Sequence, residues 1–356
     1  MQRRLPAEWE EQDAILLAWP HEDTDWGPIL DEVQGTYTQI VRAITRFEDV
    51  LIAARRTRVV ADRLAAAGIP DERVHIWQVD LNDTWTRDFG PITVLDAGKP
   101  LLMDFTFNGW GMKFAAFDDN LVTRRLHAAG ALGQTALRTV GLVLEGGGID
   151  SDGRGTLLTT SHCLLQANRS PHLTRHEIEQ ILASELGVRR VLWLEHGYLA
   201  GDDTDSHVDT LARICPDDTI VYVRCDNPAD EHYEDLSAME AELAALRTAD
   251  GRRFRLLPLP WPKAHFDEKG RRLPATYANF LIINGATLVP TYGDEPRDRA
   301  AMETIGQALP GREVVGVDCT PLIWQHGSLH CVTMQIPRGV LGTPTMKNAK
   351  QMLNEE

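Results

Sequence analysis

The chain has 356 residues, of which 43% are hydrophobic and 25% are charged, and its formal net charge is -16, from 36 Lys and Arg against 52 Asp and Glu. This composition is typical of a globular protein, and the length is ample for a large core. So acidic a chain lacks the basic face with which a general nucleic-acid-binding protein meets phosphates, and it favours a small cationic partner.

The N-terminal residues differ from a secretion signal. Arg3 and Arg4 resemble the basic start of a signal peptide, but Pro6 and several acidic residues follow where an apolar stretch should be. No apolar run approaches the ~20 residues that a membrane-spanning helix needs. We therefore expect a soluble, cytoplasmic protein whose partner is neither a membrane nor a nucleic acid.

The chain has five cysteines, an odd number, and no two of them form a CxxC pair. This argues against a disulfide framework and against a zinc knuckle. We interpret Cys163, Cys215, Cys225 and Cys319 as small core residues, because free cysteine is among the most buried residue types.

The first part of the chain contains predicted strands that alternate with helices. A strand over Ala14–Trp19 precedes a helix near Asp31–Phe47. Strands over Pro91–Leu95 and Leu101–Phe107 precede a helix near Asp118–Ala129. Apolar runs bounded by turn residues are typical of strands.

The third unit has strands over Leu142–Glu145 and Thr156–Thr160, separated by a Gly/Asp turn. Its helix begins at Thr174, which forms a capping box with Glu177, and ends before Gly187.

Two further units follow. The fourth has a strand over Thr219–Cys225 and a helix near Ala229–Arg247. The fifth contains Asn284-Gly285, the dipeptide that most strongly favours a hairpin. Its predicted elements are strands over Phe280–Ile283 and Ala286–Pro290, a helix over Asp298–Ala308, and strands near Glu313–Val317 and Cys331–Ile336.

Five such units average about 70 residues each, a spacing that suggests repeats in a cyclic arrangement. No low-complexity tract and no linker rich in Pro or Gly separates them. We therefore expect a mixed α/β fold, and a single catalytic domain over residues 1–356.

The segment Trp85-Thr86-Arg87-Asp88-Phe89-Gly90-Pro91 places two opposite charges before a Gly-Pro turn. An Arg beside an Asp is most often an exposed ion pair. Alternatively, a carboxylate in a loop is well placed to bind a substrate.

A second segment, Glu145-Gly146-Gly147-Gly148, follows an apolar strand. It reads equally well as a flexible turn or as a ligand site, since glycines let a backbone approach a ligand closely.

A third segment, residues 202–209, surrounds His207 with four carboxylates. Such a run is often a solvated loop. In an extended chain, however, His207 and Asp209 would point to the same side. A carboxylate beside an imidazole raises its pKa and suits acid and base catalysis near neutral pH.

The fourth segment, His326-Gly327-Ser328-Leu329-His330-Cys331, differs from the other cysteine environments. Cys331 follows a Gly/Ser turn flanked by two histidines and starts a predicted strand. A thiol in such a place can be exposed and yet rigidly held.

These four segments together resemble the agmatine deiminase family, which includes bacterial peptidyl-arginine deiminase-like proteins. That family carries Trp-x-Arg-Asp-x-Gly-Pro, Glu-Gly-Gly, Gly/Ser-His-x-Asp and Gly-x-x-His-Cys segments in this order. Pro6-Ala7-Glu8-Trp9, Ala18-Trp19-Pro20 and Phe107-Asn108-Gly109-Trp110-Gly111 also match, so the resemblance extends over nearly the whole chain.

The resemblance implies a fold and a set of roles. The fold would be the pentein fold, a five-bladed, pseudo-fivefold α/β propeller of ββαβ units with the active site in its central channel. Cys331 would be the nucleophile and His207 the acid/base. Asp88 and Asp209 would grip a guanidinium, and Glu145 would orient His207.

The resemblance also implies the reaction: hydrolytic deimination of agmatine to N-carbamoylputrescine and ammonia, in putrescine biosynthesis, through a covalent amidino-cysteine. We expect substrate contacts from Trp85, Arg87, Trp110 and Gly327, and neither a metal nor a cofactor. Oligomeric state is not visible in the sequence, and a homodimer is the default expectation.

The substrate's tail is left open by the sequence. Gly148 stands where agmatine deiminases usually have Asn, and His326-Gly327-Ser328-Leu329 replaces their Gly-Gly-Asn-Ile. Arginine or a peptidyl-arginine therefore remains an alternative, although the acidic balance of the chain favours the dication agmatine.

The chemistry fits these residue types. A guanidinium is a planar permanent cation, which two carboxylates can bind through paired N–H groups. The acids should raise the pKa of the Cys331 thiol in the empty site, and the bound cation should offset this effect.

Two other classes of protein remain. Asp205-Ser206-His207-Val208-Asp209 matches a metal-ligand pattern of manganese ureohydrolases, which release urea. A propeller that binds a macromolecule without catalysis is the other alternative.

Overall fold

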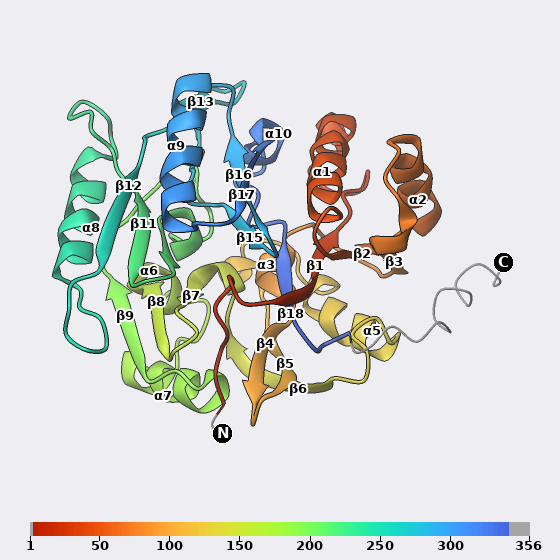
Figure 1. The fold of residues 1–356 in the computed structure, drawn as a ribbon, viewed down its shortest axis with the longest axis horizontal. Helices are drawn as coiled ribbons and strands as arrows, with labels where there is room; N and C mark the ends of the chain where they lie inside the picture. The colour runs from red at the N-terminus through yellow and green to blue at the C-terminus, as the bar shows by residue number, and fades with distance from the viewer. Residues whose placement is uncertain (1–2, 342–356) are drawn as a thin grey trace.

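The computed structural model describes residues 3–341, and five of its sheets repeat one pattern (Figure 1). In each, one pair of strands is antiparallel and the next pair is parallel. The first sheet has a fourth strand, and none of the sheets closes on itself. The strands are β18 (Met334–Pro337), β1 (Gln12–Ala18), β2 (Asp49–Ala54) and β3 (Val74–Gln78); β4 (Ile92–Asp96), β5 (Lys99–Thr106) and β6 (Ala136–Val143); β7 (Ile149–Ser151), β8 (Thr156–Thr160) and β9 (Arg190–Leu194); β10 (Ala212–Cys215), β11 (Thr219–Val223) and β12 (Arg255–Leu259); β15 (Leu281–Ile283), β16 (Ala286–Thr291) and β17 (Glu313–Asp318).

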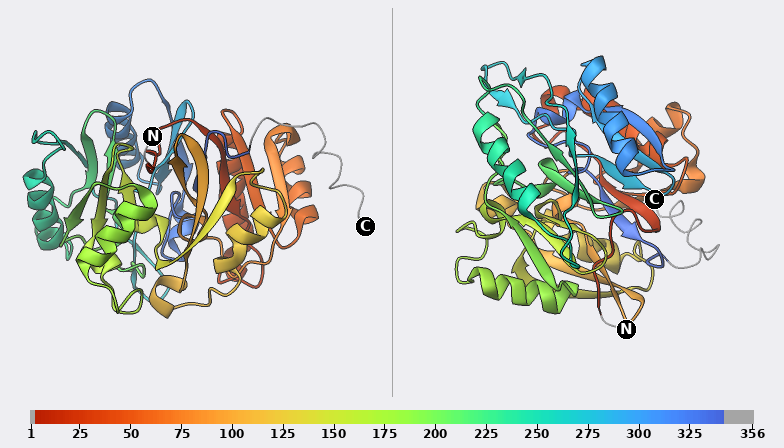
Figure 2. Two further views of the ribbon diagram at one scale, coloured as in Figure 1. Left: turned by 90° about the horizontal axis from the view of Figure 1, so that it is seen from below. Right: turned by 60° about the vertical axis from the view of Figure 1, so that its left-hand side comes forward.

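A parallel pair needs a crossover connection, and a helix supplies it in each unit. These helices are α1 (Leu30–Ile44), α5 (Val122–Ala128), α7 (Arg175–Leu186), α8 (Tyr233–Ala245) and α9 (Glu295–Ala308), and α2 (Thr57–Ala66) connects β2 to β3. They lie toward the outside of the molecule, and Figure 2 shows from other directions that α8 and α2 are at opposite ends. The mixed α/β class predicted from the sequence is confirmed.

The remaining elements are short. They are the helices α3 (Thr86–Phe89), α4 (Gly109–Met112), α6 (Ser161–Leu164) and α10 (Thr320–Ile323), the hairpin of β13 (His265–Phe266) and β14 (Arg272–Leu273), and 3-10 turns at Gly27–Ile29, Asp71–Arg73, Asp119–Leu121, Gly146–Gly148 and Val208–Thr210.

Local signals set several boundaries. Thr174 and Glu177 form the predicted capping box at the start of α7. Ile283 pairs with Ala286 across the predicted Asn284-Gly285 turn. In both places, residues within a few positions of one another supply the bonds that fix the backbone.

Two predicted strands were wrong. The partner of β8 is β7 and not Leu142–Glu145, because β6 already continues to Val143 beside β5. The last strand begins at Met334 and not at Cys331, since the Thr333 N–H bonds back to the His330 carbonyl at 3.1 Å and closes a turn. Cys331 therefore lies in a turn ahead of the strand.

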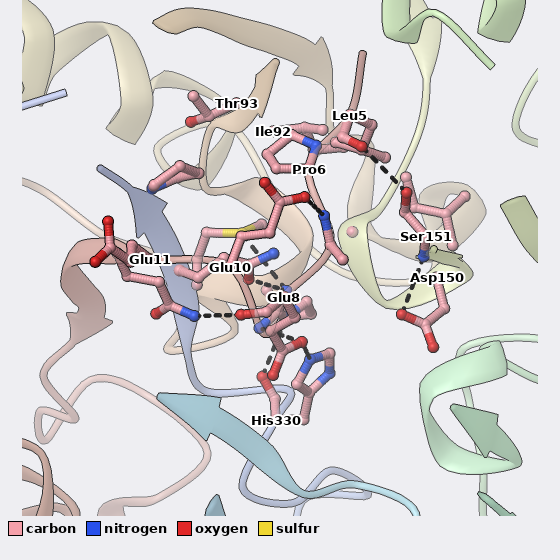
Figure 3. Close-up of a pocket in the computed structure, with 18 residues that line it drawn as sticks. Leu5, Pro6, Glu8, Glu10, Glu11, Ile92, Thr93, Asp150, Ser151 and His330 are labelled. Carbon is pink, nitrogen blue, oxygen red and sulfur yellow. Dashed lines mark hydrogen bonds and ion pairs between the residues drawn. The ribbon is translucent and has the colours of Figure 1, made fainter. Parts of the chain in front are cut away.

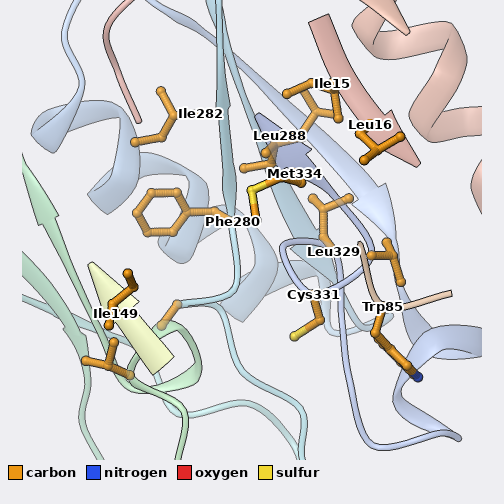
Figure 4. Close-up of a cluster of buried hydrophobic side chains, with 14 of the residues drawn as sticks. Ile15, Leu16, Trp85, Ile149, Phe280, Ile282, Leu288, Leu329, Cys331 and Met334 are labelled. Atoms are coloured by element: carbon orange, nitrogen blue, oxygen red, sulfur yellow. The ribbon is translucent and has the colours of Figure 1, made fainter. Parts of the chain in front are cut away.

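The core around this turn is apolar. Side chains of β1, β16 and β18, among them Ile15, Leu288 and Met334, pack together, and Cys331 lies at the margin of the cluster near Leu329 (Figure 4). The thiol is thus held against apolar packing on one side.

None of the helices within residues 3–341 combines the length and the apolar character needed to cross a lipid bilayer.

Candidate active site

Cys331 lines a cavity of about 220 Å³ that reaches the surface at the exposed Asp25. Asn279 holds it in place: its Oδ1 accepts hydrogen bonds from the backbone N–H of His330 at 2.9 Å and of Cys331 at 3.2 Å. The same oxygen lies 3.3 Å from Cys331 Sγ. One side chain therefore fixes both the turn and the thiol.

The Cys331 thiol is in a strongly negative surrounding. Burial, Asp209 and Asp88 raise its pKa well above the ordinary value. Asp209 Oδ2 lies 3.9 Å from Sγ. At neutral pH the thiol of the empty site is therefore protonated, as the sequence predicts.

His207 is fully buried, and neither of its ring nitrogens has a hydrogen-bond partner within residues 3–341. Nδ1 lies 3.6 Å from Asp88 Oδ1, and Nε2 lies 3.9 Å from Glu145 Oε2. Burial lowers the pKa of His207, but Asp88, Cys163 and Glu145 outweigh it and hold the pKa well above its ordinary value. The ring is therefore a charged proton donor at neutral pH.

Asp88, on α3, is buried, and each of its carboxylate oxygens accepts a hydrogen bond. Its Oδ2 accepts from Trp110 Nε1 and its Oδ1 from the Gly147 N–H, both at 3.0 Å. Burial, Asp209 and Glu145 raise its pKa to about 6, although His207 lowers it. The interpretation of Arg87 and Asp88 as an exposed ion pair was wrong, because both are buried.

The two oxygens of Asp209 differ in their hydrogen bonding. Its Oδ2 lies 2.7 Å from His330 Nδ1, whereas its Oδ1, also buried, has no partner within residues 3–341. Burial raises the pKa of Asp209, but His330, His207 and Arg213 outweigh it and lower the pKa. Asp209 is thus an ionised carboxylate with an acceptor to spare.

Gly147 marks the point where these groups meet. A Cβ there would lie 2.5 Å from His207 Nδ1, 2.9 Å from Asp88 Oδ1 and 3.1 Å from Asp209 Oδ2. Residues Val208–Thr210 form a 3-10 turn, so the extended chain assumed for His207 and Asp209 was wrong, although the two still converge. Only glycine fits at this position, because any side chain would collide with these groups.

Glu145 is fully buried behind His207. Both of its oxygens accept from Arg169 Nε, at 2.9 and 2.8 Å, and Cys163 Sγ lies 3.9 Å from Oε2. Burial raises the pKa of Glu145, but His207 and Arg169 outweigh it and lower the pKa. Cys163, interpreted from the sequence as a core residue, is buried but lies beside the site's histidine.

Trp85, Trp110 and Gly327 line the cavity with Cys331. A Cβ on Gly327 would collide with the Trp85 ring, at 2.1 Å from Cζ3. Because of this close approach, Trp85 and Gly327 form one continuous wall of the cavity. Trp110 forms another wall, and its Nε1 also donates to Asp88 Oδ2.

Arg87 faces away from this cavity. Its NH1 donates to Gln335 Oε1 at 2.6 Å, and its Nε donates to the His330 carbonyl at 3.4 Å. It lines a second cavity with Glu8 and His330. Adjacent residues of a helix cannot face the same way, so Asp88 and Arg87 cannot both meet the expected substrate.

The site offers few free ligands for a metal ion. Within residues 3–341, the group of three close potential ligands is Glu145, Cys163 and His207. The Arg169 guanidinium already neutralises Glu145 and would repel a second cation. Asp205, part of the ureohydrolase-like pattern, is bonded to Arg169 at 2.7 Å and to Lys113 at 2.8 Å.

Sequence reasoning missed several residues of this site: Glu8, Cys163, Arg169, Asn279 and His330. His330 and Glu8 lie in segments that the motifs single out, so a careful look at neighbouring histidines and acids could have found them. Arg169 and Asn279 carry no local signal.

The arrangement can bind and attack a flat cation. Within residues 3–341, the buried polar atoms without a hydrogen-bond partner include both His207 ring nitrogens and Asp209 Oδ1. The Cys331 thiol and the charged His207 imidazole supply a nucleophile and a proton donor.

The family model of the Porphyromonas-type peptidyl-arginine deiminases matches residues 4–337. An agmatine deiminase of Stutzerimonas stutzeri is 33% identical, with 94% of this chain and 95% of that protein covered. A solved Porphyromonas gingivalis protein, provisionally named an arginine deiminase, is 52% identical with a TM-score of 0.88, covering 95% of this chain and 99% of that one.

A cysteine-to-serine variant of the C. jejuni agmatine deiminase, solved with substrate bound, is 40% identical with a TM-score of 0.88, covering 95% of this chain and 97% of that one. The four motifs, the site around Gly147 and these matches agree. The chain belongs to the family of agmatine deiminases and Porphyromonas-type peptidyl-arginine deiminases.

Proposed function

We propose that this protein hydrolyses the guanidinium group of agmatine to N-carbamoylputrescine and ammonia, through a covalent amidino-cysteine at Cys331. One observation carries the proposal: Asp88, Asp209 and a charged His207 without hydrogen bonds converge on Gly147, and Asp209 Oδ2 also lies 3.9 Å from Cys331 Sγ. These are the groups that a guanidinium would satisfy.

Binding prepares the nucleophile. The guanidinium cation offsets the carboxylates that hold the Cys331 proton, so the thiol loses its proton to solvent when the substrate binds. The thiolate then attacks the guanidinium carbon. The C–N bond breaks as His207 gives its proton to the departing nitrogen, which leaves as ammonia.

Hydrolysis completes the cycle. Neutral His207 takes a proton from water, whose oxygen attacks the carbon of the amidino-thioether. The C–S bond breaks, the sulfur leaves as thiolate, and the carbonyl of the ureido product forms as the hydroxyl proton is lost. Glu145 would keep His207 oriented, and Trp85 and Trp110 would enclose the methylene chain.

The far end of the cavity favours an amine. Asp25, Asp83 and Asp203 contribute to its lining beyond Asp88. These carboxylates would attract the primary ammonium of agmatine and would repel the carboxylate of arginine. A solved relative with substrate bound is named an agmatine deiminase, which supports the same choice.

We also infer that the five ββαβ units surround one pseudo-fivefold axis, as in a pentein propeller. Their common pairing pattern and the convergence of residues from several units on one cavity support this arrangement. The inference predicts that residues lining the cavity come from successive blades.

The test is product analysis with agmatine, arginine and an arginyl peptide. We expect ammonia without urea, fastest from agmatine, and loss of turnover in Cys331→Ala with agmatine binding retained. Faster release of ammonia from arginine or from the peptide would identify that compound as the substrate in place of agmatine. Release of urea would indicate a ureohydrolase. Retained turnover in Cys331→Ala would overturn the covalent route.

A further inference from the structure

A second, smaller cavity of about 50 Å³ lies behind the nucleophile. Glu8 and His330 line it, whereas Cys331, the neighbour of His330, lines the first cavity. Figure 3 shows Glu8 and His330 facing one another at this place. The N-terminal segment therefore reaches the back of the active site.

His330 is held at both ring nitrogens. Nε2 lies 2.7 Å from Glu8 Oε2, and Nδ1 lies 2.7 Å from Asp209 Oδ2. His330 is 2% exposed, Glu8 6% and Asp209 0%. The three side chains thus form a buried bridge from the N-terminal segment to Asp209, the carboxylate assigned to the substrate.

The bridge determines which hydrogen bonds His330 must donate. Burial raises the pKa of Glu8, but Arg213, His330 and Arg87 outweigh it and hold the pKa well below its ordinary value. Asp209 is ionised as well. Two carboxylates at hydrogen-bond distance each need a donor, so His330 satisfies both only by donating an N–H from each ring nitrogen.

We propose that Glu8 is a positioning residue of the active site: it holds His330 with an N–H at each ring nitrogen, and His330 in turn holds Asp209 Oδ2, the oxygen 3.9 Å from Cys331 Sγ, in place for the guanidinium. The proposal rests on the proposed function, because it assigns Asp209 to the guanidinium of the substrate. It requires no contact between Glu8 and the substrate.

Glu8 has a structural role that the test must separate. Its Oε2 accepts from Arg213 NH2 at 2.6 Å, and its Oε1 accepts from the Ile282 N–H at 2.7 Å. Asp150 provides a matched control. Its Oδ2 lies 3.4 Å from Arg213 Nε and accepts from the Ile214 N–H, so it is a buried acid on the same arginine without a bond to His330.

The experiment compares Glu8→Gln with Asp150→Asn. Nitrogen-15 NMR of the histidines should show both His330 nitrogens protonated in the wild type and one of them deprotonated in Glu8→Gln. In a Cys331→Ala background, Glu8→Gln should weaken agmatine binding, measured by calorimetry, about tenfold or more. Asp150→Asn should leave the His330 spectrum unchanged and binding within about twofold.

Since Glu8 acts through His330, adding Glu8→Gln to His330→Gln should weaken binding no further than about twofold. A neutral His330 in the wild type, an unchanged spectrum in Glu8→Gln, equal effects of Glu8→Gln and Asp150→Asn, or additive effects in the double variant would each overturn the proposal. If Glu8→Gln does not fold, the wild-type spectrum decides.

The spectra involve no substrate, so the two proposals fail separately. Absence of ammonia release from agmatine by the wild type would overturn the proposed function. In that case a changed His330 spectrum in Glu8→Gln would still support the link from Glu8 to His330. An unchanged spectrum would overturn only the role of Glu8.

Discussion

Two buried histidines of the site, His330 and His207, differ in how they are bonded. His330 has a carboxylate oxygen 2.7 Å from each ring nitrogen. His207 has its nearest carboxylate oxygens at 3.6 and 3.9 Å, and neither nitrogen is hydrogen-bonded within residues 3–341. Both lie between two acids, yet one is saturated and the other is not.

The difference separates a histidine that supports the site from a histidine that takes part in the reaction. A fully bonded buried network stabilises one geometry, whereas an unbonded buried group costs free energy and persists only where the surroundings impose it. His330 therefore supports the site. His207 can exchange a proton without first breaking a bond to the protein.

The largest expected effect tests this contrast directly. His207→Gln should lower kcat with agmatine by about 10³-fold, because it removes the proton donor and acceptor. It also removes a cation beside Asp88 and Glu145, so the free energy of unfolding should fall, but by less than in His330→Gln, since no hydrogen bond is lost. Ammonia release and urea denaturation measure the two quantities.

His330→Gln should give the opposite balance. It leaves Glu8 and Asp209 buried without the cation between them, which should cost about 3–5 kcal/mol of unfolding free energy. If the two variants lost similar stability, or if His330→Gln lost more turnover than His207→Gln, the division between a reacting and a supporting histidine would be wrong.

A methyl group at the meeting point should have the next largest effect. Gly147→Ala places Cβ within 2.9 Å of His207 and Asp88 and must displace these two side chains. We expect kcat/KM to fall about 10²-fold or more. Gly141→Ala is the control, because a Cβ there meets nothing within 4 Å. Equal activity of the two variants would show that the reaction does not depend on the placement of His207 and Asp88.

The thiol should respond to a bound cation. Burial, Asp209 and Asp88 raise the pKa of Cys331 in the empty site, and a guanidinium between the carboxylates reduces their effect. Thiolate absorbance followed against pH should therefore rise at lower pH with an inert guanidinium analogue, by about one pKa unit or more. An unchanged or higher pKa would contradict substrate-assisted activation.

The smallest effect concerns the mouth of the cavity. Burial raises the pKa values of Asp83 and Asp203 to about 6, so both lose their charge as the pH falls below that value. KM for agmatine should then rise more steeply than KM for butylguanidine, which lacks the terminal ammonium and contacts only the acids at the guanidinium, Asp88 and Asp209.

Asp203→Asn should raise KM for agmatine about threefold at pH 8 and leave KM for butylguanidine unchanged. Parallel changes for both substrates, in the variant or in the pH series, would show that the carboxylates at the mouth of the cavity do not bind the terminal ammonium. Initial rates of ammonia release give all of these values.

The sequence by itself determined what depends on neighbouring residues. The Asn284-Gly285 hairpin and the Thr174 capping box form through bonds within a few positions. The ordered motifs likewise pointed to Cys331, His207, Asp88 and Glu145, because their residue types and order carry the family's pattern.

The tertiary structure alone decided which of these groups are bonded and which are free. Asn279 comes to Cys331 and Arg169 to Glu145 from distant parts of the chain, and Arg87 turns away from its neighbour Asp88. Burial and long-range packing set these partners, and a hydrogen bond or a pKa depends on the distance between side chains in space. No local pattern of residues contains that distance.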